Sequence, residues 1–571
     1  MHIENFYEIF IDTGLSKWYH KDKRSEKRGG LSVKRIALLL CAAIVFCTCT
    51  ACGSNEKTVT VAYDLSASPA NIDPQSAVTQ DAIILLNHIM QGLYRIDEQG
   101  EAQKALAADT TVSQDGTTYT ITIRDDAMWF YLDEDKNEQS MPVTAQDFVF
   151  AFRRLLRPDT QSPGASRFFC IQNAEEVNNG TLSEEELGVW AQDERTVVFQ
   201  LTSANDSFLY LLASTYAMPC NEAFFEEARG RYGLNEDTIL SNGAYRISSW
   251  DTSSQIRLVK NSSYYDAGNV LADQIRFRIT TSETDRTDIT RLSDGTVDAM
   301  LLSGEAASAL SEKDYRVTWI ESGTWGLLIN TQDEVLSNTN IRRGIAQCFD
   351  RSVYEPMLPS YLEVADTLFP DSASIFGALT ASSQSATGIA ADVQAGIASY
   401  ESGLLEVGQT TLDGVALLVN GDAGQDVTTY FLQVSQLLQR DLGIYISIET
   451  VDASEYQSRM ASGDYDIAAV CFEAADNDVL SYLEPFITGS SENLCGYSDS
   501  RVDDLFYSAS VAQTAASALA DCRSAEAQIL NSGVFLPMFR QLDAFVVRQD
   551  TSGLVYNSNT GMVSLSGTQF S

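Results

Sequence analysis

Strands and helices alternate through the second half of the chain, and this pattern restricts the fold more than any other feature of the sequence. Apolar, strand-like runs occupy Val415–Val419, Ile444–Ile448 and Asp466–Phe472. The first two are separated by a helical stripe made of Val427, Tyr430, Phe431, Val434 and Leu438. A second short helix near Ser454–Ala461 precedes the third run. Buried strands joined by helices of this length form a sheet with helices on its faces, so we expect an α/β fold.

The first half has shorter strands and more turns. Alternating hydrophobicity predicts strands at Val59–Asp64, Tyr119–Arg124, Thr196–Leu201 and Gln255–Val259. Helices are predicted at Ala82–Leu93 and after the capping box that runs from Thr144 to Asp147, with Pro158 as its stop. Residues 372–403 are rich in Ser, Ala and Gly, which indicates a loop leading into a weak helix. At about 150 residues per domain, the 571 residues hold three or four domains' worth of chain.

A basic and apolar segment near the N-terminus resembles a bacterial lipoprotein signal. Residues 34–52 read KRIALLLCAAIVFCTCTAC, and the apolar run of 16 residues, Ile36–Ala51, is followed by Cys52. As a helix this run spans about 24 Å, which is short of the roughly 30 Å hydrocarbon core of a bilayer. A cleaved signal with Cys52 as the lipidated residue therefore fits better than a membrane span. Cys49 stands where the signal usually has leucine. Cys49 as the lipid acceptor and a plain secretory signal with a cysteine nearby are the alternatives, but the residues before Cys49 are a poorer match to the small residues that such a signal needs.

The segments around this signal are assigned by their composition. Residues 1–32 are polar, of mixed charge and without periodicity, and we interpret them as a non-native extension upstream of a true start at Val33. Residues 33–51 then form the lipoprotein signal peptide. Residues 52–57 form a short linker between the lipid anchor and the folded protein.

Charge and histidine content exclude several classes of function. The chain has 38 Lys and Arg against 78 Asp and Glu, and this net charge of −40 disfavours nucleic acid as a partner. Only His88 follows the signal, so no HExxH zinc site exists and a catalytic triad would have His88 as its single available base. The sequence also lacks GxSxG, GxxxxGK[ST] and GxGxxG motifs. We therefore expect no metal, no cofactor and no enzymatic activity.

Four blocks of sequence follow one another in an order that matches a known family. The first contains Ala105–Ala107, Asp115–Asp125 and Pro142–Phe150, and the second begins with Ser241–Ile247 and continues to Lys260–Tyr265. The third and fourth contain Leu327–Asn330, Asn340–Ala346, Asp350–Arg351, Gly463–Ile467, Asn493–Tyr497 and Asp503–Leu505. Together these blocks resemble the extracytoplasmic peptide-binding receptors of ABC importers, the dipeptide/oligopeptide-binding group of family 5 solute-binding proteins. They span nearly all of residues 58–545.

The resemblance implies a two-lobed clamp of the periplasmic-binding-protein type, class II, with an extra subdomain in its first lobe. Lobe I would comprise residues 58–322 and lobe II residues 323–543, while residues 544–571 would return to lobe I. Two strands crossing between the lobes would form a hinge, and the ligand would close the lobes around itself. The implied partners are a short peptide or other small solute, ABC permease subunits with their ATPases, and the membrane through the lipid anchor. We expect a monomer on the outer side of the plasma membrane.

The resemblance also implies a ligand site, on which this chain departs from the family. In the oligopeptide binders an aspartate after the strand corresponding to Asp466–Phe472 pairs with the α-ammonium group of the peptide. Here Ala475 falls at that position, so Asp476 one residue later and Glu473 are the candidates. Ala469 falls where a carboxylate-binding arginine would stand. The full set of predicted ligand residues is Ala77, Val78, Trp325, Cys471, Phe472, Glu473 and Asp476.

Alternatives stay open at each of these points. The acids after the strand are equally compatible with a solvated surface cap, and Trp325 with an ordinary core aromatic of the hinge. The changes at Ala469 and Ala475 leave an oligosaccharide, an opine or a metal chelate as other ligands for the same fold. A peptide-sensing receptor that works without a transporter is a further alternative. Six cysteines follow the signal, and the sequence does not decide between disulfides and small core residues.

Overall fold

The computed structural model describes residues 58–571 apart from short gaps at 78, 98–99, 133–136, 354, 384–387, 424, 475–476 and 558–559. The predicted signal peptide, the predicted lipidation site Cys52 and two predicted ligand residues, Val78 and Asp476, therefore lie outside the described residues. All described residues belong to a single compact unit, Thr58–Ser571.

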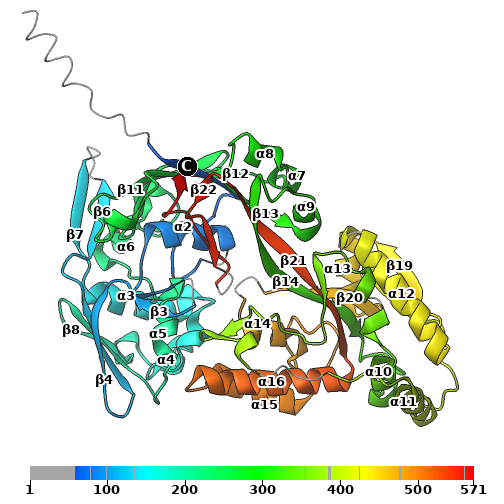
Figure 1. Cartoon of the computed structure of the whole chain (residues 1–571). Coiled ribbons are helices and arrows are strands. Elements are labelled where there is room, and N and C mark those ends of the chain that lie inside the picture. Colours follow the sequence, from blue (N-terminus) through cyan, green and yellow to red (C-terminus); the bar gives the residue numbers. More distant parts are fainter. Residues whose placement is uncertain are drawn as a thin grey trace, which may run out of the picture. The chain divides into compact units, whose positions relative to one another are not determined.

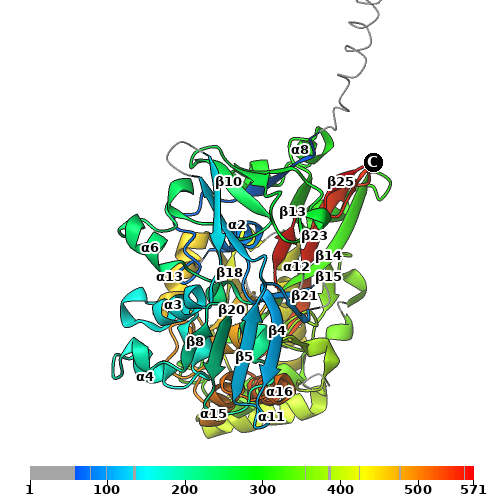
Figure 2. The same ribbon diagram turned by 90° about the vertical axis from the view of Figure 1, so that its left-hand side faces the viewer.

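The N-terminal half of this unit forms lobe I, which is built on two four-stranded sheets. The first sheet has the order β1 (Thr60–Leu65), β12 (Gln274–Ile279), β11 (Gln255–Lys260) and β10 (Tyr245–Asp251). The second has the order β4 (Ala107–Val112), β5 (Thr118–Ile123), β9 (Thr196–Gln200) and β8 (Val189–Asp193), and in Figure 2 it lies toward the viewer. Only β1 and β12 pair in parallel; the other neighbours in these sheets are antiparallel.

Helices α2 (Gln80–Ile89) and α3 (Ala145–Leu156) pack in the core of lobe I. The predicted capping box opens α3, since the Asp147 carboxylate accepts a hydrogen bond of 2.8 Å from the Thr144 backbone N–H. The same carboxylate accepts a bond of 3.0 Å from the Trp129 indole, which ties the start of the helix to the hairpin β6 (Met128–Leu132) and β7 (Glu138–Pro142). Phe148 and Phe152, on the predicted apolar face, are completely buried.

Two long antiparallel strands, β14 (Tyr315–Ile329) and β21 (Phe535–Arg548), run side by side from lobe I into the second lobe (Figure 1). At one end β21 also pairs with β13 (Ala299–Ser303), and at the other end β14 pairs with β20 (Ile467–Phe472). The pairing of β14 with β21 shifts register between Glu321 and Gly323 and again between Trp325 and Gly326. An extra residue in a strand bends it and weakens the ladder locally, so the crossing is suited to act as a hinge.

Lobe II contains the elements from α10 (Thr339–Gln347) to α16 (Ala515–Ser532) and has the predicted α/β architecture. Strands β20, β18 (Ala416–Asn420) and β19 (Ser447–Val451) are parallel neighbours. Leu417 and Val419 of β18 point into a core shared with α10, α11 (Val393–Glu406) and α12 (Gln425–Leu442). Leu418, between them, points into a second core shared with α13 (Ala453–Ser462) and α16. Helices therefore cover both faces of the sheet, and the two-lobed α/β prediction is confirmed.

The predicted strand Ile444–Ile448 is wrong in its position. The strand β19 begins only at Ser447, which pairs with Ala416. Ile444 and Ile446 are buried in the lobe II core from the loop that precedes the strand, and the Ser435 hydroxyl donates a hydrogen bond of 2.9 Å to the Ile446 carbonyl. Buried apolar residues in this loop alternate with exposed residues, as they would in a strand.

The C-terminal segment that follows β21 packs against α2 of lobe I. The Gln80 side chain donates a hydrogen bond of 2.6 Å to the Gly561 carbonyl, and the Leu565 N–H donates one of 3.3 Å to Nε2 of His88. The other ring nitrogen of His88, Nδ1, lies 2.7 Å from the Ile84 carbonyl and donates to it. Burial lowers the pKa of His88 to about 4. Both nitrogens are engaged inside the protein, so the structure does not support a role for His88 as a catalytic base.

The six cysteines of the described part, Cys170, Cys220, Cys348, Cys471, Cys495 and Cys522, are all free thiols. Four of them, Cys220, Cys348, Cys495 and Cys522, are buried. These four therefore act as small core residues, one of the two possibilities that the sequence left open. Among the helices that the structure describes, none combines the length and the apolar character that crossing a membrane requires.

Candidate functional site

A cavity of about 1450 Å³ lies between the two lobes, beside the crossing strands. Its walls come from both sides: Gln80, Ile83, Tyr216, Glu283 and Ser303–Glu305 belong to lobe I, and β20, α13 and the segment Ser481–Leu494 to lobe II. Pockets for small molecules measure about 300–1,000 Å³, so this cavity has room for a larger, extended ligand together with water. A ligand here would touch both lobes and would therefore stabilise their closed arrangement.

The centre of the cavity wall is formed where β20 pairs with β14. Cys471 is the register partner of Trp325, and Phe472 is the partner of Thr324. Trp325 is 9% exposed, and its indole N–H donates a hydrogen bond of 2.7 Å to the Gln541 side chain. Its ring centroid lies 6.2 Å from that of Phe431 and 6.3 Å from that of Phe539. Trp325 lines the cavity, but most of its surface is packed in the core of lobe II, as in the alternative interpretation of this residue.

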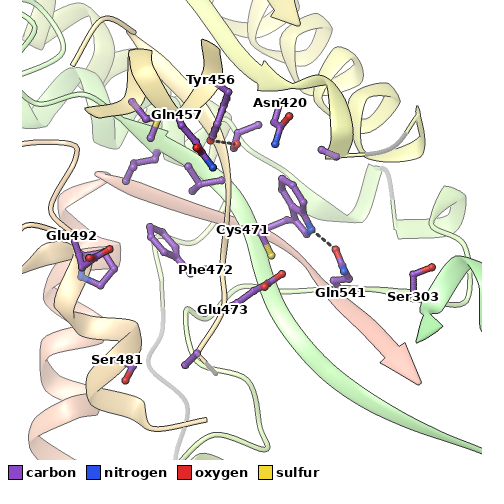
Figure 3. A pocket seen from close by; sticks show the side chains of 18 of the residues that line it. Ser303, Asn420, Tyr456, Gln457, Cys471, Phe472, Glu473, Ser481, Glu492 and Gln541 are labelled. Carbon is purple, nitrogen blue, oxygen red and sulfur yellow. Dashed lines mark hydrogen bonds between the residues drawn. The ribbon is translucent and has the colours of Figure 1, made fainter. Parts of the chain in front are cut away.

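Phe472 lines the cavity from an aromatic cluster. Its ring centroid lies 4.9 Å from that of Phe535 and 5.2 Å from that of Phe486, both of which are buried. The cluster holds the ring of Phe472 in place, while its remaining surface is available to an apolar side chain of a ligand. Figure 3 shows Phe472 beside Cys471 and Glu473 on the same stretch of chain.

The Glu473 side chain follows β20 directly and is exposed to the cavity. Gly323 of β14 makes room for it: a Cβ atom at Gly323 would lie 2.5 Å from Cys471 Sγ and 2.7 Å from Glu473 Cγ. Desolvation by the surrounding protein atoms and the charge of Asp543 raise the pKa of Glu473, and a hydrogen bond from the Cys471 thiol opposes this rise. Burial and the neighbouring Glu473 charge raise the pKa of Cys471, so this residue stays a thiol and donates to the carboxylate.

A second carboxylate lies close to Glu473 on the crossing strand β21. Desolvation raises the pKa of Asp543, while hydrogen bonds from Ser322, the Gln541 side chain and the Gly304 backbone N–H oppose this rise. The Gln541 amide donates to Asp543 Oδ1 at 3.3 Å and its oxygen accepts from Trp325. Two desolvated carboxylates near each other both retain protons more readily than usual, and both are stabilised in the charged form by a cation.

Comparison with known proteins identifies the family. Residues 101–493 match the middle region of the bacterial extracellular solute-binding proteins of family 5. This match covers more than half of the chain. The chain belongs to this family.

The similarity to individual members of the family extends over nearly the whole length of this chain. The dipeptide-binding protein DppE of Bacillus subtilis is 24% identical over 550 residues, which are 93% of this chain and 97% of DppE. The substrate-binding domain of an oligopeptide ABC transporter from Bacillus anthracis is 26% identical, with a TM-score of 0.65 over 90% of this chain and all of that domain. The pheromone receptor PrgZ, whose mode of peptide binding has been described, is also 26% identical, with a TM-score of 0.65 over 90% of this chain and all of that receptor.

Of the predicted ligand residues, Trp325, Cys471, Phe472 and Glu473 come together at the cavity of this solute-binding protein. Ala77 does not line it: its side chain is buried in the lobe I core, and its N–H bonds the Asp73 carbonyl at 2.8 Å in a tight turn. Gln80 and Ile83, further along the same segment, reach the cavity instead. The predicted ligand contact of Ala77 therefore stays a prediction, one that the lining of this cavity does not include. Val78 and Asp476 lie outside the described residues.

Asn477 and Asp478, which follow residues 475–476, contact other segments of the protein. The Asn477 side chain donates a hydrogen bond of 2.7 Å to the Ser372 carbonyl, and the Ser374 N–H donates one of 2.9 Å to the Asn477 carbonyl. Asp478 lies 3.7 Å from Arg167 of lobe I, so this loop also links the two lobes.

Sequence reasoning missed most of the polar residues that line the cavity. They are Gln80, Tyr216, Glu283, Ser303, Glu305, Tyr361, Asn420, Tyr456, Gln457, Ser481, Glu484, Glu492 and Gln541. Most of these lie near helix starts or on exposed faces, where polar residues are expected in any soluble protein, so the sequence carried no signal to distinguish them.

Proposed function

We propose that the chain is the lipid-anchored, extracytoplasmic substrate-binding protein of an ABC importer that captures short peptides between its two lobes. The observation that carries this proposal is the large cavity between the lobes with the Glu473 carboxylate exposed in it. A peptide brings a terminal ammonium group into a space that closure separates from water. A charge taken out of water without a partner costs several kcal/mol, and Glu473, beside the crossing strands, is a partner that this cavity offers.

The remaining contacts fit a ligand held without tight selection of its side chains. Extended peptides bind to such sites through main-chain hydrogen bonds, and hydrated pockets accept different side chains. Ala469, at the position of the family's arginine, lines the cavity and brings no charge to it. The carboxyl end of a peptide is therefore met by water or lies outside this part of the cavity, and longer peptides or modified C-termini are accepted.

The proposal extends to partners and to chemistry. The closed form delivers its ligand to two permease subunits with their ATPases, the lipid on Cys52 keeps the protein at the membrane, and the protein acts as a monomer. It carries out no covalent reaction, because it needs only to bind and release. The similarity to the pheromone receptor PrgZ favours one alternative within the same proposal, in which the captured peptide is a signal rather than a nutrient.

Native mass spectrometry of the purified full chain tests the capture of peptides. We expect an additional mass that matches short peptides, which disappears after partial unfolding and refolding and returns when a peptide mixture is added. A bound oligosaccharide or metal chelate in place of a peptide would contradict the proposal and favour a different ligand class on the same fold.

The Cys52→Ser variant tests the lipid anchor. We expect the variant to move from the membrane fraction to the soluble extracellular fraction, because a hydroxyl cannot accept the diacylglyceryl group that a thiol accepts. Fractionation followed by immunoblotting measures the distribution, and Cys49→Ser is the matched control that should stay at the membrane. If Cys52→Ser remains in the membrane fraction, the anchor lies elsewhere, and loss of retention in Cys49→Ser would place it on Cys49.

A further inference from the structure

The charged side chains that line the cavity in the described part of the chain are of one sign. Five glutamates line it: Glu283 and Glu305 from lobe I, and Glu473, Glu484 and Glu492 from lobe II. Among the described residues that line the cavity there is no lysine, arginine or histidine. Figure 3 shows Glu473 and Glu492 on the lobe II side of this space, with Ser303 of lobe I opposite. Because the glutamates come from both lobes, closing the lobes brings their charges together.

None of these five side chains is neutralised within the part of the chain that the structure describes. All five are exposed, and no described lysine or arginine forms an ion pair with any of them. Two buried acids elsewhere in the protein do form ion pairs. Asp73 pairs with Arg154, and Glu526 pairs with Arg523 at 2.8 Å. These two buried acids have a cationic partner inside the protein, whereas the five glutamates of the cavity have none among the described residues.

The lobes touch beside the cavity, so the space between them is partly closed in this structure. The Asp206 N–H of lobe I donates a hydrogen bond of 2.8 Å to the Gln513 carbonyl of lobe II, and Arg167 lies 3.7 Å from Asp478. When the lobes close further around a ligand, water leaves this space, and charges that face each other across it interact more strongly than charges in bulk water. A zwitterionic peptide brings no net charge into this space, and its carboxylate adds another negative group. A ligand with further cations offsets the repulsion between the lobes.

We propose that the cavity selects cationic peptides, which carry at least one lysine or arginine side chain in addition to the terminal ammonium group. This inference rests on the proposed function, since it assigns the class of peptide to the same cavity. Glu473 receives one cation near the crossing strands, and Glu484 and Glu492 of lobe II receive the second. Peptides with acidic side chains are excluded because they enlarge the uncompensated negative charge.

A peptide library with one defined variable position tests this inference. The purified full chain is incubated with equimolar peptides in which that position is lysine, norleucine or glutamate and the neighbouring positions are mixed. Captured peptides are then quantified by mass spectrometry. We expect the lysine series to be enriched at least tenfold over the norleucine series, and the glutamate series to be depleted. The Glu484→Gln/Glu492→Gln double variant should lose most of this enrichment, while Glu401→Gln, an exposed glutamate of α11 away from the cavity, should retain it.

The outcomes separate the inference from the function on which it rests. Capture of all three series in equal amounts overturns the selection for cations and leaves peptide binding intact. Enrichment that is unchanged in the double variant also overturns it, because the preference then comes from the net charge of −40 of the whole chain. Capture of no peptide from any series counts against the proposed function itself. Far-ultraviolet circular dichroism and the melting temperature show that the double variant is folded.

Discussion

Replacing Glu473 with glutamine is expected to weaken binding of a peptide with a free N-terminal amine by about thirtyfold or more. The Glu473 carboxylate is exposed in the cavity and has no cationic partner among the described residues, so the ligand ammonium group is its natural counter-charge. Removing one member of a desolvated charge pair leaves the other unpaired, at a cost of about 2 kcal/mol or more. That cost corresponds to the stated loss of affinity. Isothermal titration calorimetry with a peptide found by the library experiment measures it.

Two controls make this result specific. An N-acetylated version of the same peptide should bind the unchanged protein weakly, and its affinity should not fall further in Glu473→Gln. The Glu401→Gln variant, on the exposed face of α11, should bind like the unchanged protein. If acetylation changes the affinity by less than about threefold, or about 0.7 kcal/mol, no carboxylate of this cavity binds the ammonium group. Asp476, outside the described residues, is then excluded together with Glu473.

The carboxyl groups of Glu473 and Asp543 predict a pH dependence of peptide binding. The pKa values of Glu473 and Asp543 are raised in the ligand-free cavity, so both carboxyl groups take up protons at higher pH than ordinary acids. A peptide ammonium group binds the deprotonated form, and it stays protonated below about pH 7.7. Affinity should therefore be full above the raised pKa values and should fall as the pH is lowered through them. The fall should be smaller in Glu473→Gln, which has one titrating group less.

The architecture of lobe II could be predicted because buried strands and helices have characteristic patterns of apolar residues in the sequence. Leu417, Leu418 and Val419 alternate between two cores that lie on opposite faces of one sheet, and a fully apolar strand is the signature of such burial. This pattern does not identify a strand where a buried segment forms no hydrogen bonds with a neighbouring strand. Ile444 and Ile446 are as buried as strand residues, but they belong to a loop whose carbonyl bonds the Ser435 hydroxyl. Hydrophobicity reports burial, and only hydrogen bonding distinguishes the strand from the loop.

Only the lobe II part of the candidate site could be predicted, because there consecutive residues of one strand end line the cavity. Cys471, Phe472 and Glu473 follow one another at the end of β20, so placing the strand places all three at the cavity. Glu283 and Glu305 lie in short helices of lobe I. In the sequence they cannot be distinguished from other exposed acidic residues. Their place in the cavity depends on how β14 and β21 carry one lobe toward the other. That relation joins residues more than 150 positions apart, and no local pattern contains it.

The Arg154→Met variant is expected to lower the free energy of unfolding of lobe I by about 3–5 kcal/mol. Arg154 and Asp73 form an ion pair whose side chains are only 5% and 9% exposed. The guanidinium also donates hydrogen bonds of 2.8 Å to Gln75 and 3.3 Å to Cys220, and it lies 3.9 Å from the centre of the Phe225 ring. Methionine fills part of the space but leaves the Asp73 charge buried without a partner, which accounts for the loss.

The matched control is Arg157→Met, at the end of the same helix. Its ion pair with Glu184 is 36% and 26% exposed, so its loss should cost under about 1 kcal/mol. Chemical denaturation of both variants measures the difference, and equal losses would show that burial does not decide the cost. The network also reaches the cavity, because Gln75 donates a hydrogen bond of 3.2 Å to the carbonyl of Tyr216, which lines it. Arg154→Met should therefore weaken peptide binding at temperatures where the variant is still folded, whereas Arg157→Met should leave binding unchanged.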